Sequence, residues 1–216
     1  MNEETLLGYT NYVTKLFADE DDALTECRAE IAREGMPIIH VSPAQGKILY
    51  LIARMMSPKR ILELGTLGGY SAIWLARALP EDGKLITLEL DQHHADVSRR
   101  NIDRAGLSSK VEVRVGPAAD TLKQMQADGE PAFDLAFIDA DKDGYPAYLD
   151  LCVPMVRAGG IILADNTLSG NILDENSDSG IARYNKAAAA HPALESIIFP
   201  VLRERGIDGL LLSIKK

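Results

Sequence analysis

The chain has 216 residues and a formal net charge of −9, from 32 acidic and 23 basic side chains. At roughly 150 residues per domain, this length predicts a single domain over residues 1–216, with an ordinary hydrophobic fraction of 46%. The acidic balance argues against a general nucleic-acid or membrane surface, and two distant cysteines without a signal-peptide pattern predict a reduced, cytoplasmic protein with no membrane partner.

The first 56 residues are predicted to form a helical cap. Apolar positions recur at helical spacing over residues 11–34, where the acidic run 19–22 is interpreted as a solvated face. A further helix over residues 44–56 is indicated by Pro43, because proline is favoured in the first helical turn.

From residue 60 onward, short apolar runs alternate with amphipathic stretches. This alternation predicts βαβ units and an α/β, doubly wound core over residues 60–216. The short connection at 200–208 predicts an antiparallel hairpin at the sheet edge. Seven strands are expected at 60–64, 84–90, 111–115, 133–138, 160–164, 194–199 and 209–214, with helices at 69–79, 93–105, 118–127, 145–156 and 181–190.

In sheets of this kind, ligands bind beyond the carboxyl ends of the strands. The first strand is followed by a glycine-rich turn, residues 65–71, whose spacing is G-x-x-G-G. The second strand ends in Glu89, which is placed to accept hydrogen bonds from ribose hydroxyls. The turn and the acid together favour a nucleoside ligand over a tight turn beside a solvated glutamate. The absence of G-x-G-x-x-G spacing weakens the alternative of a nicotinamide dehydrogenase.

Oxygen-bearing side chains follow two further strands. Asp139 comes directly after the fourth strand, and Asp165 and Asn166 come after the fifth. If these strands are neighbours, the three side chains converge, and a hard cation such as Mg²⁺, Ca²⁺ or Mn²⁺ would relieve the repulsion between the carboxylates. The alternative is that each side chain caps a helix or forms an Asx-turn.

The runs 61–71, 137–142 (FIDADK) and 163–167 (LADNT), together with Glu89, resemble the cation-dependent, S-adenosylmethionine-dependent O-methyltransferases. This is the catechol and caffeoyl-coenzyme-A O-methyltransferase family, and the likeness is greatest to its small bacterial members. The resemblance extends over residues 37–214. It implies a Rossmann-like methyltransferase fold with a mostly parallel seven-stranded sheet, and it implies S-adenosylmethionine and a divalent cation, most simply Mg²⁺, as cofactors.

The resemblance also implies roles for single residues. Lys142 matches the catalytic lysine. The matches to the metal ligands are Asp139, Asp165 and Asn166. The matches to cofactor-binding positions are Val41, Glu63, Gly65, Thr66, Ser71, Glu89, Ala118, Asp139 and Asp141. Many plant relatives have a tryptophan after the DN motif, whereas this chain continues with residues 167–170 (TLSG), so the acceptor pocket is expected to differ. Its candidates are Leu168, the polar segment 170–180 and Tyr145, for which helix packing is the alternative.

The expected function is methyl transfer to a hydroxyl of a catechol-like or other vicinal-diol small molecule. One alternative is methylation of a hydroxylated base in tRNA by the same chemistry, which needs a basic channel beside the site; the candidates are Arg54, Lys59, Arg60 and Arg183. A second alternative is a cofactor-binding module without catalysis. Relatives are commonly dimers, so a homodimer is expected, with the amino-terminal helix as an interface element.

Overall fold

The computed structural model describes residues 2–203 and 206–216. The strands are β1 (Arg60–Leu64), β2 (Lys84–Glu89), β3 (Val111–Val115), β4 (Phe133–Ile138), β5 (Val156–Ala164), β6 (Leu194–Arg203) and β7 (Gly206–Lys215). The helices are α1 (Glu3–Phe17), α2 (Asp22–Arg33), α3 (Pro43–Met56), α4 (Tyr70–Ala76), α5 (Gln92–Arg104), α6 (Ala118–Ala127), the short 3₁₀ helix η1 (Lys142–Gly144), α7 (Tyr145–Met155) and α8 (Gly180–Ala190).

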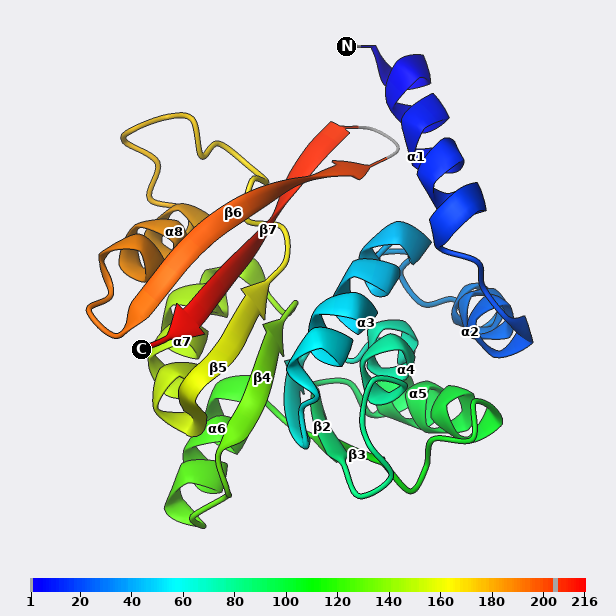
Figure 1. Ribbon diagram of the computed structural model, residues 1–216, viewed down its shortest axis with the longest axis horizontal. Helices are drawn as coiled ribbons and strands as arrows, with labels where there is room; N and C mark the ends of the chain where they lie inside the picture. Colours follow the sequence, from blue (N-terminus) through cyan, green and yellow to red (C-terminus); the bar gives the residue numbers. More distant parts are fainter. Residues whose placement is uncertain (1, 204–205) are drawn as a thin grey trace.

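The seven strands form one sheet in the order β3-β2-β1-β4-β5-β7-β6 (Figure 1). Strands β1 to β5 pair in parallel, and β7 pairs antiparallel with both β5 and β6. The order reverses between β1 and β4, which is the switch point at which doubly wound sheets bind ligands. The predicted α/β, Rossmann-like fold with a mostly parallel sheet and an antiparallel final hairpin is therefore confirmed.

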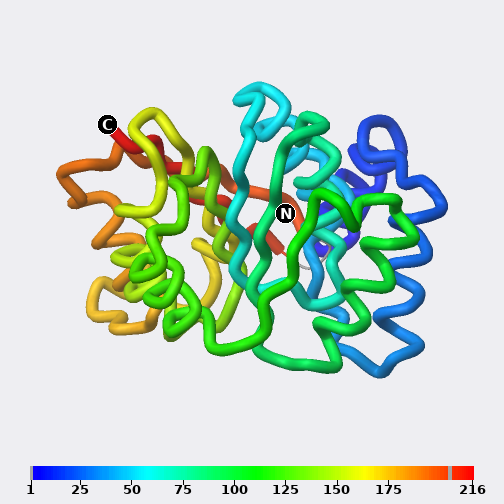
Figure 2. The backbone as a smooth tube through the Cα atoms, turned by 90° about the horizontal axis from the view of Figure 1, so that it is seen from below, coloured from blue at the N-terminus to red at the C-terminus, as the bar shows by residue number. Residues whose placement is uncertain are grey.

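Successive side chains along each strand point to opposite faces of the sheet, which divides the hydrophobic core into two halves. Ile61 packs with α2, α3, α4 and α5, whereas Leu62 packs with α6, α7 and α8 on the other side of the sheet. Figure 2 shows the two groups of helices on opposite sides of the central strands. Both sides of β1 and β4 are covered, which explains why their sequences are mostly apolar, whereas the edge strand β3 (VEVRV) alternates and is only partly buried.

The amino-terminal prediction is wrong in one respect. The expected single helix over 11–34 is two helices, because Asp21 caps the start of α2 and accepts a hydrogen bond from the Leu24 amide at 3.1 Å. Asp21 also pairs with Arg77 of the chain segment after α4 at 2.5 Å. The acidic run is thus partly a helix start and an ion-pair partner rather than only a solvated face.

The predicted hairpin is longer in the structure than in the sequence analysis. Strands β6 and β7 stay paired as far as Arg203 and Gly206, and Val201 pairs with Asp208. Backbone pairing needs no apolar side chains, so polar residues expected in a connection continue the ladder. Among the helices of the described residues, none combines the length and the apolar character needed to span a bilayer.

Candidate active site

The carboxyl ends of β1, β4 and β5 lie level with one another. Leu64 is in register with Ile138, and Ile138 is in register with Ala164. The next residues continue the pairing, since the Asp139 amide donates to the Leu64 carbonyl at 2.9 Å and the Asp165 amide donates to the Ile138 carbonyl at 3.0 Å. Asp139 and Asp165 are therefore neighbours at one sheet edge, as the sequence predicted.

The turn after β1 is built around glycine. Gly65 has a φ of +91°, and a Cβ at this position would lie 2.1 Å from the Asp139 carbonyl oxygen. The turn is held from two helices, because the Cys27 thiol and the Asn101 side-chain amide both donate to the Gly68 carbonyl, at 3.3 and 2.9 Å. Only glycine permits this backbone conformation and this approach of β1 to β4.

Glu89 at the end of β2 holds the same turn. One carboxylate oxygen accepts hydrogen bonds from the amides of Thr66 at 3.2 Å and Leu67 at 2.7 Å. The other accepts from the Asp91 amide at 3.0 Å and lies 3.6 Å from His94 Nδ1. The predicted ribose acceptor thus also organises the backbone that surrounds the cavity.

Glu63 lies behind the turn and is fully buried. The Thr87 hydroxyl donates to its Oε2 at 2.6 Å, so Thr87 must accept from the Thr66 hydroxyl, also 2.6 Å away. The second oxygen, Oε1, is buried and has no hydrogen-bond partner among the described residues. Burial raises the pKa of Glu63 to about 7. The role predicted for Glu63 in cofactor binding stays a prediction, because it does not line the cavity described next.

A cavity of about 680 Å³ opens at this sheet edge. It is of the size of a small-molecule site. Of the residues predicted to bind cofactor, metal or acceptor, those that line it are Val41, Gly65, Thr66, Ser71, Glu89, Asp139, Asp141, Lys142 and Asn166. It is also lined by residues without a predicted role, which include Ile38, Ile39, His94 and Arg203.

A second cavity of about 260 Å³ adjoins the first. Both are lined by Gly65, Glu89 and Asp141, so the two cavities share part of their walls. Ala118, the predicted adenine-side contact, lines the second cavity beside the apolar Leu90 and Pro117.

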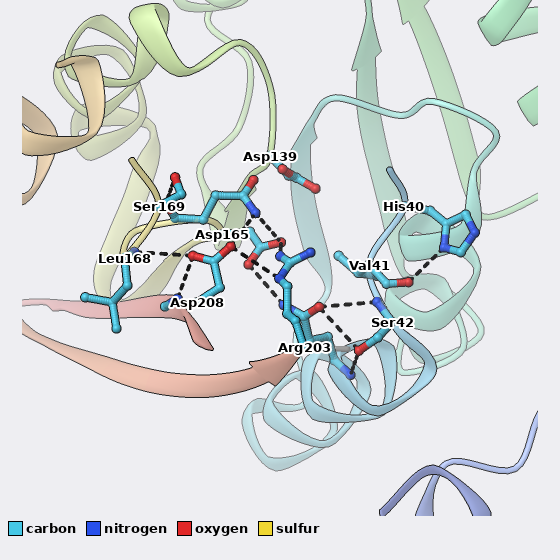
Figure 3. Close-up of polar contacts among 12 residues, drawn as sticks. His40, Val41, Ser42, Asp139, Asp165, Leu168, Ser169, Arg203 and Asp208 are labelled. Atoms are coloured by element: carbon cyan, nitrogen blue, oxygen red, sulfur yellow. Dashed lines mark hydrogen bonds and ion pairs between the residues drawn. The ribbon is translucent and has the colours of Figure 1, made fainter. Parts of the chain in front are cut away.

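Asp165 lies at the centre of a cluster of polar contacts (Figure 3) and is 1% exposed. Its Oδ1 accepts from Gln45 Nε2 at 3.0 Å, and its Oδ2 accepts from Arg203 at 2.7 Å. The same guanidinium lies 3.2 Å from Asp208 Oδ2, which also accepts from the Asn166 side-chain amide at 3.1 Å. Three elements thus converge on one carboxylate: the start of α3, the end of β5 and the β6–β7 hairpin.

The electrostatics of this cluster suit a positive charge. Burial raises the pKa of Asp165, and the neighbouring Asp139 raises it further, while Arg203 opposes both effects. No group of three His, Cys, Asp or Glu side chains in the described part of the chain forms a metal site, and the predicted ligand set has only two carboxylates and one amide. Its all-oxygen chemistry fits a hard divalent cation. Arg203 already brings a positive charge to this carboxylate, so a cation held by Asp165 would compete with that contact.

Lys142 reaches the site from η1. Its ammonium donates to Asp139 Oδ1 at 2.9 Å and to the Tyr145 hydroxyl at 3.0 Å. Asp141 precedes it, caps η1 by accepting from the Gly144 amide at 2.9 Å, and accepts a hydrogen bond from the Tyr148 hydroxyl. The DADK run therefore presents a base candidate, a metal-ligand candidate and a cofactor-contact candidate within four residues.

Two of the four basic residues considered for an RNA channel lie away from the site. Lys59 and Arg60 stand at the start of β1, at the opposite end of the strand from the site. They are paired with Asp82 at 2.9 Å and with Glu130 at 2.5 Å. These two residues therefore contribute no positive rim to the cavity.

Three contributors to the cluster around Asp165 were missed by the sequence analysis. Gln45 forms a capping box with Ser42, and the S-x-x-Q spacing is a visible sign of that role but not of its bond to Asp165. Asp208 and Arg203 lie in the segment expected to be a connection. Nothing in their local sequence indicates that the hairpin would bring them to Asp165.

Comparison with known proteins extends over the whole chain. The O-methyltransferase family matches residues 14–216. A catechol O-methyltransferase from Niastella koreensis is 45% identical over 221 residues, which cover 100% of both chains. A solved O-methyltransferase from Bacillus cereus in complex with SAH has a TM-score of 0.95 at 38% identity, with 99% of this chain and 100% of that chain covered. An O-methyltransferase of tomaymycin synthesis from Streptomyces achromogenes, solved with SAM, has a TM-score of 0.94 at 33% identity, with 100% and 99% covered.

Proposed function

The chain belongs to the O-methyltransferase family, and from this premise we propose that it methylates a hydroxyl of a catechol-like small molecule with the help of a divalent cation. It is an S-adenosylmethionine-dependent O-methyltransferase. The acceptor, the cation and the roles of single residues make up the proposal. The observation that carries it is the convergence of Lys142, Asp139 and Asp165 beside the glycine turn at one sheet edge.

The two adjoining cavities support a site for the cofactor. S-adenosylmethionine supplies an electrophilic methyl group on a sulfonium. We assign the ribose to Glu89 and the adenine to the apolar end at Ala118, where Leu90 and Pro117 also lie. Gly65 and Thr66 then border the methionine part, which leaves the region of Lys142 and Asn166 for the acceptor.

The chemical difficulty lies in the acceptor hydroxyl. A phenol has a pKa of about 10, so forming the phenolate at pH 7 costs about 4 kcal/mol, at about 1.4 kcal/mol for each of roughly 3 pKa units. A cation held by Asp139, Asp165 and Asn166 would supply positive charge that favours the phenolate. A catechol offers two adjacent oxygens to such a charge, whereas a simple phenol offers one.

Lys142 is the proposed base for this proton. In the structure its side-chain nitrogen is paired with Asp139 Oδ1 at 2.9 Å, beside the proposed cation ligands. Asp139 is also a proposed cation ligand, so a cation held there would compete with this pair and would leave the Lys142 nitrogen available to the acceptor hydroxyl. Lys142 can then take the proton from the hydroxyl of the methyl acceptor. The remaining contribution of the chain is to align that hydroxyl oxygen with the methyl group of the cofactor.

Methyl transfer to catechol and to phenol tests this proposal. We expect the purified protein with S-adenosylmethionine and Mg²⁺ to methylate catechol at least a hundredfold faster than phenol, which lacks the second oxygen. Product formation is followed by mass spectrometry. Equal rates for the two acceptors, or no transfer to any of a panel of catechols, would contradict the proposed acceptor class.

We also propose that the chain forms a homodimer through α1. This helix exposes five large apolar or aromatic side chains: Leu7, Tyr9, Tyr12, Leu16 and Phe17. A surface of this kind on one helix is typical of an interface. Sedimentation velocity tests the assignment: the wild type is expected at the dimer mass and a Tyr12→Glu, Leu16→Glu variant at the monomer mass, whereas an unchanged mass in the variant would remove α1 from the interface.

A further inference from the structure

Tyr145 occupies the first position of α7 and is fully buried. Its hydroxyl accepts a hydrogen bond from Lys142 Nζ at 3.0 Å. The same hydroxyl is within donating distance of two backbone carbonyls, that of Ile138 at 3.2 Å and that of Asp165 at 3.1 Å. Tyr145 therefore connects the lysine to the ends of both β4 and β5.

The hydrogen-bond inventory fixes the direction of these contacts. A tyrosine hydroxyl has one proton, and the two carbonyls can only accept, so that proton is directed to them. The oxygen lone pairs are left for Lys142. The hydroxyl thus receives a hydrogen bond from the amine nitrogen at a point set by two strand ends.

The ring of Tyr145 is itself held in place. It packs edge-on against Tyr184 of α8, with ring centroids 5.4 Å apart and an interplanar angle of 73°. Lys142 Nζ also lies 4.9 Å from the centre of the Tyr145 ring. The hydroxyl oxygen therefore has little freedom to follow a lysine that moves.

Lysine by contrast has a long, flexible side chain, and that of Lys142 is 38% exposed. Its other contact in the structure is Asp139, a proposed cation ligand. A cation held by Asp139 would compete with this contact, and the Tyr145 hydroxyl would then be the hydrogen-bond partner that restrains Nζ. A base must lie within hydrogen-bond reach of the proton it accepts, so this restraint bears directly on turnover.

We propose that Tyr145 is a positioning residue that holds the amine nitrogen of Lys142 beside the acceptor, through the hydrogen bond between its hydroxyl and Nζ. This inference rests on the proposed function, in which Lys142 is the base. It concerns where the amine lies and not its protonation. Tyr145 itself stays outside the chemistry, because its proton is committed to the two carbonyls.

The chain offers a matched control. Tyr184 is equally buried, touches Tyr145, and its hydroxyl has no hydrogen-bond partner among the described residues. Tyr145→Phe and Tyr184→Phe therefore remove the same group from neighbouring rings, and only the first removes a contact with Lys142. We expect Tyr145→Phe to lower kcat for catechol at least tenfold, with KM and the cofactor Kd within twofold of the wild type. Tyr184→Phe is expected to leave all three within twofold.

A double-mutant cycle separates positioning from a general structural effect. In a Lys142→Ala background, Tyr145→Phe should cause no further loss of the residual rate, because there is no amine left to position. Kinetics are measured well below the melting temperatures, and calorimetry gives the cofactor Kd for every variant. The same fold-loss in both backgrounds, or a Tyr145→Phe kcat within twofold of Tyr184→Phe, would overturn the inference. Wild-type turnover in Lys142→Ala would instead overturn the assignment of the base.

Discussion

Gly65→Ala should lower turnover and cofactor affinity far more than an alanine substitution at a glycine outside the site. The alanine Cβ would lie 2.1 Å from the Asp139 carbonyl oxygen, whereas contacts under 3.0 Å are essentially never seen. The ends of β1 and β4 must therefore move apart by about 1 Å, a misplacement that can cost about 100-fold in rate. Left-handed backbone at φ +91° adds about 1–2 kcal/mol, and overpacking adds about 1–3 kcal/mol, to the loss in unfolding free energy.

Gly106→Ala is the control for backbone strain alone. Gly106 also has a positive φ, +70°, but an added Cβ would meet nothing within 4 Å. Its expected loss in unfolding free energy is only about 1–2 kcal/mol. Urea unfolding gives the stabilities, and calorimetry and catechol turnover give the cofactor Kd and kcat. If Gly65→Ala matched Gly106→Ala within twofold in both Kd and kcat, the close approach of β1 to β4 would not be what shapes the site.

Glu89→Gln should weaken cofactor binding at least tenfold in calorimetry, because an amide cannot accept charge-assisted bonds at both ends; an unchanged Kd would contradict this role. Arg203→Ala should tighten Mn²⁺ binding to the cofactor-free protein, because the guanidinium no longer competes for Asp165. The variant should also melt at a lower temperature than the wild type, because a buried carboxylate loses its partner. Weaker Mn²⁺ binding would show that Arg203 supports the site. In the wild type, the raised pKa of Glu63 gives a stability that is present at low pH and is lost as pH rises from 4.5 to about 7. Glu63→Gln has no such carboxyl, so its unfolding free energy should rise relative to that of the wild type over this range. A difference in unfolding free energy that stays constant with pH would contradict the raised pKa.

The sheet could be predicted because each strand carries its own signal. The runs at 60–64 and 133–138 are almost entirely buried, and the run at 111–115 alternates apolar and polar residues; the predicted bounds of all three are those of the structure. The ends of β6 and β7 could not be predicted in the same way. Pairing there is decided by the partner strand, so Arg203 and Gly206 continue the backbone pairing although their residue types do not indicate a strand.

The candidate site was predictable where it depends on position along a strand. Asp139 and Asp165 follow neighbouring parallel strands, and parallel strands end at one edge. The contacts of Gln45 and Arg203 with Asp165 depend instead on how α3 and the hairpin pack in three dimensions. Sequence distance gives no measure of that approach, and the single helix expected over 11–34 failed for a related reason, because one capping aspartate outweighed the apolar periodicity.

The most direct test of the central claim is the turnover of catechol by wild type and Lys142→Ala, each with EDTA and after the return of Mg²⁺. Wild-type methyl transfer should be abolished by EDTA and restored by Mg²⁺. Lys142→Ala should be nearly inactive in both conditions, with a cofactor Kd within twofold of the wild type. Full wild-type activity in EDTA, or equal turnover of wild type and Lys142→Ala with Mg²⁺, would contradict the cation-assisted mechanism and its base.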